Sequence, residues 1–436
     1  MNWLTDNNIT HYKFGENNVF YSPIGRCYVV ATDEQYANNI NNQSYEDIFS
    51  CLTDYIPIAQ QRKVRAPGDY TLLTVLPNNK CNFSCSYCYS AKGRNNDQLS
   101  ISNLKIAIDY FFDSKGKDFV KPLTISFMGG GEPMLSWDVV KFGVSYARQL
   151  AQSRGYKLNI RIITNGSILN DEYLQFIKEQ NIEISVSYEI IPEIQNIQRK
   201  HYEIVKSNIN YLIASNIPVQ LNATITPLNV SRITEMVEIV NIDYPTVKNI
   251  MFEPVVSEDM FDSPQEMNSF YQQYIDSFIQ GRILADKYHI ELTSFAFLRT
   301  IYPLERACPG EFCITAKGDI TGCYCVDSNK MSLFKNTKYG SIDKTNIVFD
   351  NEQFDELINC NVYRKPECKD CEVKWNCGGG CYHQYHTYSK PYRDEVCVFT
   401  KKFVERVIEY KINKALQQNH YLEIFKQPIF LREEQI

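Results

Sequence analysis

The chain has 436 residues, a hydrophobic fraction of 44% and a formal net charge of −6. This length predicts two or three globular domains, and the negative charge gives no electrostatic attraction to nucleic acid. No apolar run reaches the roughly 18 residues that a membrane helix needs, and MNWLTDNNITHYKFG lacks the basic and apolar regions of a secretory signal. We therefore expect a cytoplasmic protein with no nucleic-acid or membrane partner.

Residues 1–68 are predicted to form an N-terminal extension. HYKFGENNVFYSPIGRCYVVA (11–31) predicts a hairpin that turns at SPIG. DEQYANNI (33–40) and SYEDIFSCLTDYI (44–56) predict two short helices. This extension carries no motif that indicates a function.

Strand-like and helix-like segments alternate from residue 71 to about 285, which predicts a parallel α/β sheet. The predicted strands are 71–77, 123–129, 157–165, 182–188, 219–225 and 249–256. The predicted helices between them are 101–114, 136–155, 169–181, 199–216 and 231–243, of which 136–155 begins at a serine and ends at a glycine. Ligands of such sheets bind at the carboxyl ends of the strands.

The most informative motif follows the first of these strands. Cys81, Cys85 and Cys88 have C-x₃-C-x₂-C spacing on one predicted loop. Three thiolates so close together can hold three irons of a 4Fe–4S cluster and leave the fourth iron open. A structural zinc site would need a fourth ligand, and the nearest histidine after the triplet is His201. A thiol-rich loop without metal is the remaining alternative.

Two further strand ends carry motifs. GGGEP (129–133) combines glycines, which allow close backbone approach, with the carboxylate of Glu132. A glycine-rich loop with one carboxylate suits a zwitterionic ligand with an ammonium group. Asn165 lies in TNG (164–166), which is also a common turn sequence.

A second group of cysteines lies near the C-terminus, after a stretch from 89 to 307 that has none. It includes Cys308-x₉-Gly318-x₄-Cys323, then Cys368-x₂-Cys371-x₅-Cys377-x₃-Cys381, and finally Cys397. Zinc ribbons use similar spacings, so a zinc domain is an alternative to iron–sulfur clusters. Disulfides are disfavoured because we expect a reducing cytosol.

Together, the cysteine triplet, GGGEP and the C-terminal pattern resemble the radical S-adenosylmethionine (SAM) enzymes that carry a C-terminal SPASM domain. The resemblance covers roughly residues 70–400. It implies a partial (β/α)₆ barrel over 69–290, a cysteine-rich SPASM domain over 291–410 and a C-terminal tail over 411–436. In peptide-modifying relatives, the position of residues 1–68 often holds a leader-peptide recognition module; a packing extension is the alternative.

The same resemblance implies the cofactors, which are SAM and three 4Fe–4S clusters. Cys81, Cys85 and Cys88 would hold the SAM-binding cluster. The expected SAM contacts are Tyr87 beside the adenine, Gly129, Gly130, Gly131 and Glu132 at the ammonium, with Asn165, Ser187, Glu189 and Arg199 as further contacts. Ser187 and Glu189 match the Ser and Asp of a Ser-Leu-Asp-Gly-Pro stretch, but Ile190 and Ile191 replace its Gly and Pro, which weakens these assignments.

For the auxiliary clusters, the resemblance assigns Cys368, Cys371, Cys377 and Cys397 to an outer cluster and Cys308, Cys323 and Cys381 to an inner one. Cys313 is the first choice for the fourth inner ligand, Cys325 the second and an open iron the third. With Cys313 as that ligand, Cys27, Cys51, Cys325 and Cys360 remain, and we interpret them as small buried hydrophobic residues.

The predicted function is that of a maturase that cleaves SAM to a 5′-deoxyadenosyl radical and cross-links a ribosomally made peptide. A thioether is the first choice of bond, and a carbon–carbon or ether link the second. The expected partners are a precursor peptide with a leader and an electron donor such as flavodoxin or ferredoxin. The alternatives are a sulfatase-type maturase that forms formylglycine and a zinc-stapled binding protein without catalysis.

Overall fold

The structure is a computed structural model that describes residues 3–42, 50–53, 64, 66–116, 119–307, 310–418 and 428–433. Its centre is an eleven-stranded sheet of order β10-β9-β8-β7-β6-β5-β4-β11-β12-β13-β14. The strands from β10 to β4, and β11 beside β4, run parallel to one another. Their bounds are β4 Leu72–Val75, β5 Leu123–Phe127, β6 Leu158–Thr164, β7 Glu183–Ser187, β8 Val219–Ile225, β9 Asn249–Pro254 and β10 Glu291–Thr293.

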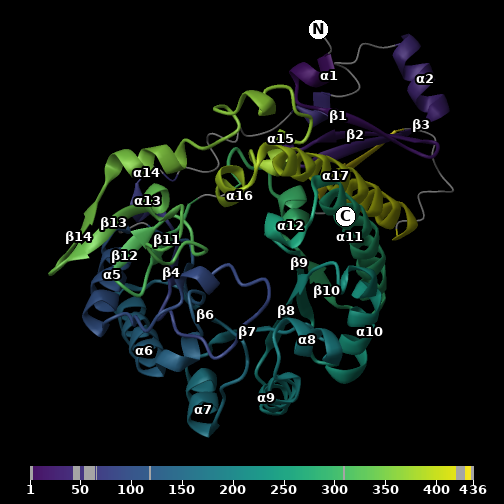
Figure 1. The fold of residues 1–436 in the computed structure, drawn as a ribbon. Helices are drawn as coiled ribbons and strands as arrows, with labels where there is room; N and C mark the ends of the chain where they lie inside the picture. Colours follow the sequence, from purple (N-terminus) through teal and green to yellow (C-terminus); the bar gives the residue numbers. More distant parts are fainter. Residues whose placement is uncertain are drawn as a thin grey trace.

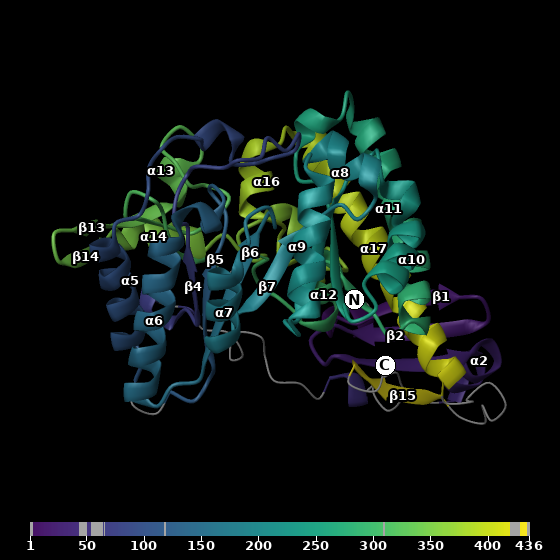
Figure 2. The same cartoon turned by 90° about the horizontal axis from the view of Figure 1, so that it is seen from below.

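The connecting helices cover the outer face of this sheet, and Figure 2 shows α5, α6, α7 and α9 in front of its strands. Alternation of buried and half-buried residues along β8 separates a face packed on the helices from an inner face. The bounds are α5 Ile101–Asp113, α6 Trp137–Arg154, α7 Asp171–Glu179, α8 Pro192–Gln198, α9 Tyr202–Ala214, α10 Ile233–Asp243, α11 Pro264–Lys287 and α12 Phe295–Ile301. The curved parallel sheet with outer helices confirms the predicted partial barrel.

The segment after the barrel extends the same sheet. β11 (Phe312–Ile314) pairs with β4, and the antiparallel strands β12 (Asp319–Thr321), β13 (Lys338–Asp343) and β14 (Asn346–Phe349) follow at the edge seen in green in Figure 1. Short helices carry the chain onward: α13 Phe334–Thr337, α14 Asn351–Ile358, α15 Lys374–Cys377 and α16 Tyr382–Thr387. The long α17 (Lys390–Gln418) then packs along α11. The C-terminal cysteine region is therefore joined to the barrel through β4 itself.

The two ends of the chain form a second, four-stranded sheet of order β1-β2-β3-β15. Its strands are β1 Thr10–Phe14, β2 Asn17–Ser22, β3 Cys27–Thr32 and β15 Ile429–Arg432, flanked by α1 Trp3–Asp6 and α2 Asp33–Asn42. Val19 and Val30 pack against Ile408 and Ile412 of α17 in one apolar cluster, and Figure 1 shows this sheet beside α17. Lys411 of α17 forms a buried ion pair with Glu433, which also accepts a hydrogen bond from Tyr28.

This N-terminal sheet also contacts the C-terminal cysteine region. The Trp375 indole donates to Asn8 over 2.9 Å, and the Asn376 amide donates to the Tyr21 hydroxyl over 2.9 Å. Cys371 packs against the same apolar cluster as Val19. The sequence predicted a domain boundary between residues 410 and 411, but α17 continues through these residues to Gln418. The residues beyond α17 then contribute β15 to the N-terminal sheet.

Most sequence-predicted elements are found within one to three residues of their predicted bounds. The predicted hairpin is β2–β3 with its turn at SPIG, preceded by β1, and the first predicted short helix is α2. Gly155 ends α6 in the left-handed conformation at φ 71°. The second predicted short helix, 44–56, lies largely outside the described residues. No helix in the described part of the chain is long and apolar enough to cross a bilayer.

Candidate active site

The cysteine triplet lies on the loop that leaves the carboxyl end of β4. Cys81, Cys85 and Cys88 are half-buried and none of them forms a disulfide. The Cys88 amide donates to the Cys85 carbonyl over 3.2 Å, and the Ser86 amide donates to Gln198 at the end of α8 over 3.0 Å. The three thiols are therefore partly accessible on a loop that is fastened to its neighbours.

Hydrogen-bond donors point at two of these three sulfurs. The Arg94 Nη2 atom lies 3.2 Å from Cys88 Sγ. Asn165 Nδ2 lies 3.9 Å from Cys81 Sγ, and the Phe83 amide lies 3.4 Å from the same sulfur. Donors to sulfur favour the thiolate, which is the form that binds iron.

The glycine-rich loop after β5 packs against the backbone that leads into the cysteine loop. Gly129 and Gly130 have φ values of +49° and +67°, which glycine adopts without strain. A Cβ on Gly131 would lie 1.8 Å from the Lys80 carbonyl oxygen, so this close approach requires glycine. The Gly131 amide donates to Asn78 over 2.9 Å, which joins the two loops.

Glu132 fastens the glycine-rich loop to the TNG loop. Its side chain is 2% exposed, and its carboxylate accepts from Met134 N at 3.1 Å, Thr164 Oγ1 at 2.6 Å and Asn165 N at 2.7 Å. Burial raises the pKa of Glu132, while these three hydrogen bonds act in the opposite direction. A carboxylate offers about four acceptor positions, so one position remains for a ligand after the three protein donors.

Tyr87, Glu189 and Arg199 form a buried polar group behind Cys85. Arg199 Nη1 donates to the Tyr87 hydroxyl over 2.9 Å and lies 3.8 Å from Glu189, and Tyr87 in turn donates to Glu189. Burial raises the pKa of Glu189 to about 7, although Arg199 and Tyr87 lower it. Arg199 is itself buried, and its Nε atom has no hydrogen-bond partner among the described residues.

Ser187 is the last residue of β7 and lies outside this hydrogen-bonded group. The structure thus brings together the motifs that the sequence separated by more than a hundred residues. Asn165 and Glu132 lie on the side of Cys81, whereas Glu189 and Arg199 lie on the side of Cys85. All of these residues follow the carboxyl ends of the parallel strands β4 to β7.

Cys368, Cys371, Cys377 and Cys397 approach one another at the start of α17. Desolvation raises the pKa of Cys397 to about 11, and the nearby Cys377 and Cys371 raise it further. Desolvation, followed by Cys377, likewise raises the pKa of Cys368 to about 12. Four thiolates so close together would repel one another unless a positively charged centre were bound between them, and this repulsion adds to desolvation in raising these pKa values.

The cysteines predicted for the inner cluster do not all lie together. The Cys323 and Cys325 thiols are hydrogen-bonded to each other, and Cys381 lies near both of them. Cys313 lies in β11, fully buried between β4 and β12, where desolvation raises its pKa well above the usual value. Cys308 and Cys51 are outside the residues whose side chains the structure describes. Cys360 lines a small cavity with Cys323, Gly310 and Gly380.

Among the described residues, no group of three or more His, Cys, Asp or Glu side chains converges on one point as ligands to a single metal ion do. The four thiolates of a cubane bind four different irons and are therefore more widely spaced than ligands to one ion. The donor set of three thiols with donors to their sulfurs fits an iron–sulfur cluster better than a zinc ion.

Three residues of this site were not predicted from the sequence: Arg94, Thr164 and Asp327. Arg94 contacts Cys88 but lies in no motif, whereas Thr164, which contacts Glu132, is the first residue of TNG. Thr164 could have been found, since it precedes Asn165 at the same strand end. Asp327 became evident only from the path of the chain, because it is 239 residues from Cys88 in the sequence.

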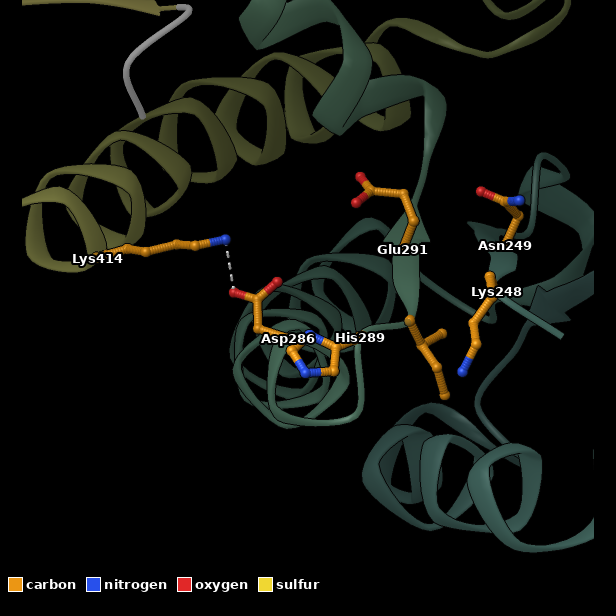
Figure 3. A pocket seen from close by; sticks show the side chains of 7 residues that line it. Lys248, Asn249, Asp286, His289, Glu291 and Lys414 are labelled. Carbon is orange, nitrogen blue, oxygen red and sulfur yellow. Dashed lines mark ion pairs between the residues drawn. The ribbon is translucent and has the colours of Figure 1, made fainter. Parts of the chain in front are cut away.

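A larger open pocket of about 480 Å³ lies at the opposite, amino-terminal edge of β9 and β10. Figure 3 shows Lys414 directed at Asp286, with which it forms a 3.0 Å ion pair, and Glu291 beside them. Glu291 is paired with Arg282 over 2.7 Å. Because its acids are already paired and it is remote from the cysteines, we do not assign this pocket to the active site.

Comparison with known families shows that residues 75–240 match the radical SAM superfamily. An uncharacterized protein, MJ0907 of Methanocaldococcus jannaschii, is 28% identical over 166 residues, which are 37% of this chain and about half (54%) of that protein. A cysteine-type anaerobic sulfatase-maturating enzyme of Clostridium novyi is 21% identical over 334 residues, covering 70% of this chain and 85% of that enzyme.

Two solved structures share the fold. The anSMEcpe structure with bound AdoMet aligns with a TM-score of 0.62 at 16% identity, over 78% of this chain and 99% of that one. The Streptococcus suis SuiB structure bound to precursor peptide SuiA aligns with a TM-score of 0.56 at 13% identity, over 90% and 98%.

Proposed function

We propose that this chain, which belongs to the radical SAM superfamily, is a maturase that cross-links a ribosomally made peptide. The chain is an enzyme related to anSMEcpe and SuiB, in which the partial barrel is followed by a cysteine-rich SPASM region. The peptide, the cross-link and the assignment of individual residues are our proposal. A thioether is the first choice of bond and a carbon–carbon or ether link the second.

One observation carries this proposal: three loops from neighbouring strand ends meet at the cysteine triplet. Asn165 reaches Cys81 from the loop after β6, and Glu132 ties that loop to the glycine-rich loop after β5. The glycine-rich loop in turn lies on Asn78 and Lys80, just before Cys81. Thiolates, a glycine-rich loop packed beside them and a buried carboxylate with a fourth acceptor position are the groups that an iron–sulfur cluster and an amino acid ligand need.

In this proposal, Cys81, Cys85 and Cys88 hold a 4Fe–4S cluster. Glu132 accepts a hydrogen bond from the ammonium group of SAM at its remaining acceptor position, and Gly129–Gly131 let the ligand approach the backbone. When bound, the cluster and SAM supply the one-electron chemistry that removes a hydrogen atom from a substrate. Tyr87 and Arg199 hold the cysteine loop against the end of α8 and keep a positive charge beside Cys85.

The C-terminal cysteines support two auxiliary clusters. We assign Cys368, Cys371, Cys377 and Cys397 to the outer one because the structure gathers these four thiols. Cys323 and Cys381, with Cys308, are assigned to the inner one. Arg299 of α12 lies near Cys377 and Cys381 and also near Glu253 of β9, so a substrate in the barrel would lie between the SAM cluster and the auxiliary clusters.

A sulfatase-type maturase is the second candidate, because the Clostridium novyi relative carries that name and aligns over most of its length. The SuiB structure covers more of this chain than the anSMEcpe structure does, 90% against 78%. The anSMEcpe alignment has the higher TM-score, 0.62 against 0.56, so the two alignments show a shared fold without separating the two candidates. The cross-linking enzyme that we propose would act on a precursor peptide and draw electrons from a flavodoxin or ferredoxin.

The test is anaerobic reconstitution followed by incubation with SAM, a reductant and a short cysteine-rich peptide. We expect SAM cleavage and a peptide product that has lost two hydrogen atoms. Exchange of a cysteine sulfur for an aldehyde oxygen would instead identify the formylglycine reaction. The Cys81/Cys85/Cys88→Ala variant is the control, and SAM cleavage by that variant would refute the assignment of the reactive cluster.

A further inference from the structure

We propose that Arg94 and Asp327 form a buried link between the auxiliary-cluster segment and the reactive cysteine loop, through which Arg94 sets the reduction potential of the cluster at Cys88. This inference rests on the proposed function, since it needs a cluster at Cys81, Cys85 and Cys88. Arg94 and Asp327 are positioning residues in it, because neither would touch the substrate.

Arg94 contacts a cluster cysteine directly. Its Nη2 atom lies 3.2 Å from Cys88 Sγ, and its backbone follows the short helix Ala91–Gly93 that ends the cysteine loop. A guanidinium stays charged at every physiological pH and carries several donors in a fixed plane. The Nη2 atom of Arg94 can therefore donate to Cys88 while its Nη1 atom donates to a second acceptor.

The second nitrogen of Arg94 lacks a partner within the part of the chain that the structure describes, and the carboxylate of Asp327 lies nearby. Arg94 Nη1 is buried without a hydrogen-bond partner there, and Asp327, which is only 3% exposed, has the Ser90 hydroxyl beside it and the Arg94 charge within electrostatic range. A buried charge without a partner is strongly disfavoured, whereas opposite buried charges offset each other. Arg94 and Asp327 attract each other electrostatically without being in direct ion-pair contact, so we infer that a small bridging group such as a water joins them.

The packing confirms that Asp327 lies against the cysteine loop. A Cβ on Gly93 would lie 2.3 Å from Asp327 Oδ1, and one on Gly130 would lie 3.5 Å from Asp327 Oδ2. Asn79 Oδ1, which has no hydrogen-bond partner among the described residues, is buried in the same region 3.6 Å from the Gly130 position, and the Ser90 hydroxyl lies beside Asp327. Glycine at 93 is thus what allows the carboxylate to reach the residue next to Arg94.

Asp327 belongs to the segment that carries the inner auxiliary cysteines. It follows Cys323 and Cys325 on the loop after β12, and Lys330 from the same loop donates to the Arg94 carbonyl over 3.4 Å. One end of the link is therefore a ligand of the reactive cluster, and the other end is two residues from Cys325.

The charges of this link predict its effect on the cluster. Reduction adds a negative charge to the cluster, so a positive donor at a ligating sulfur stabilises the reduced state and raises the potential. The negative charge of Asp327 acts in the opposite direction by offsetting part of the Arg94 charge. Removal of Arg94 should lower the potential, and removal of the Asp327 charge should raise it.

The experiment measures the midpoint potential of the reactive cluster by redox titration followed by electron paramagnetic resonance in the full chain. The signal is identified as the one that the Cys81/Cys85/Cys88→Ala variant lacks. We expect Arg94→Gln to shift the midpoint to lower potential and Asp327→Asn to shift it to higher potential. Arg94→Lys, which keeps the charge, should lie closer to the wild type than Arg94→Gln. Arg161→Gln removes an exposed arginine paired with Glu183 and serves as the matched control without a shift.

Unchanged midpoints in Arg94→Gln and Asp327→Asn, or shifts in the same direction, would overturn the inference. If Arg94→Gln loses iron while Arg94→Lys retains it, the charge is needed to hold Cys88, which supports the link. If both Arg94 variants lose iron equally, the role assigned to the charge is wrong. The proposed function fails independently, since it is refuted when the triple cysteine variant still cleaves SAM.

Discussion

Replacement of Glu132 tests whether its last acceptor position binds SAM. In Glu132→Ala, the three donors Met134 N, Thr164 Oγ1 and Asn165 N lose their acceptor inside the protein. An unsatisfied buried donor costs about 1–3 kcal/mol, so this variant should lose at least about 3 kcal/mol of stability. Glu132→Gln retains a side-chain oxygen that can accept and removes the charge, which makes it the more informative variant.

The ammonium contact predicts a second, separate effect on affinity. A charge-assisted hydrogen bond contributes about 1.5–3 kcal/mol, against about 0.5–1.5 kcal/mol for a neutral one. Because Glu132→Gln keeps an acceptor and loses the charge, it should bind SAM roughly ten-fold more weakly. Calorimetric titration of the reconstituted protein measures this affinity, and the iron content shows whether the cluster is intact. A dissociation constant equal to that of the wild type, with full iron content, would mean that Glu132 only fastens the loops and does not bind the ligand.

Two further predictions concern buried groups. Burial raises the pKa of Glu189 to about 7, so between its unfolded pKa near 4.5 and pH 7 the native state binds more protons than the unfolded state, and stability should fall as pH rises. Glu189→Gln should flatten this dependence in urea unfolding at a series of pH values, and an unchanged slope would contradict the assignment. At the inner auxiliary site, we expect Cys325→Ala to change the iron–sulfur absorption more than Cys313→Ala, because Cys325 contacts Cys323 whereas Cys313 is enclosed in β11. A larger effect of Cys313→Ala would instead support the first choice made from the sequence.

The order of the barrel strands was predictable because each strand is apolar, short and followed by an amphipathic helix. Such local patterns specify the six strands from β4 to β9. The extension by β11 to β14 was not predictable in the same way, because these strands are short and β11 pairs with β4 across more than two hundred residues. The return of β15 to β3 has the same physical origin, since pairing between distant strands leaves little local signal.

The candidate site was partly predictable for a related reason. Cys81, Glu132 and Asn165 lie at strand ends in short motifs, so the sequence places them at one edge of the sheet. Glu189 and Arg199 were expected as ligand contacts, but their burial and mutual hydrogen bonding with Tyr87 depend on the packing of α8. Asp327 had no sequence signal at all, because its significance comes from a neighbour that only the folded chain supplies.

The contact of α17 with both ends of the chain has a thermodynamic consequence. Cys397 lies on this helix, and Cys371 packs on the apolar cluster shared by α17 and the N-terminal sheet. Iron binding at these thiols would stabilise the same packing that holds the sheet together. A molecule that binds the sheet and shifts α17 would alter the affinity of the outer thiols for iron. By the same linkage, iron at these thiols would alter the affinity of the sheet for that molecule by the same factor. In the proposed enzyme, a cluster at the outer thiols and the N-terminal sheet would therefore be reciprocally coupled, although they come from opposite ends of the sequence.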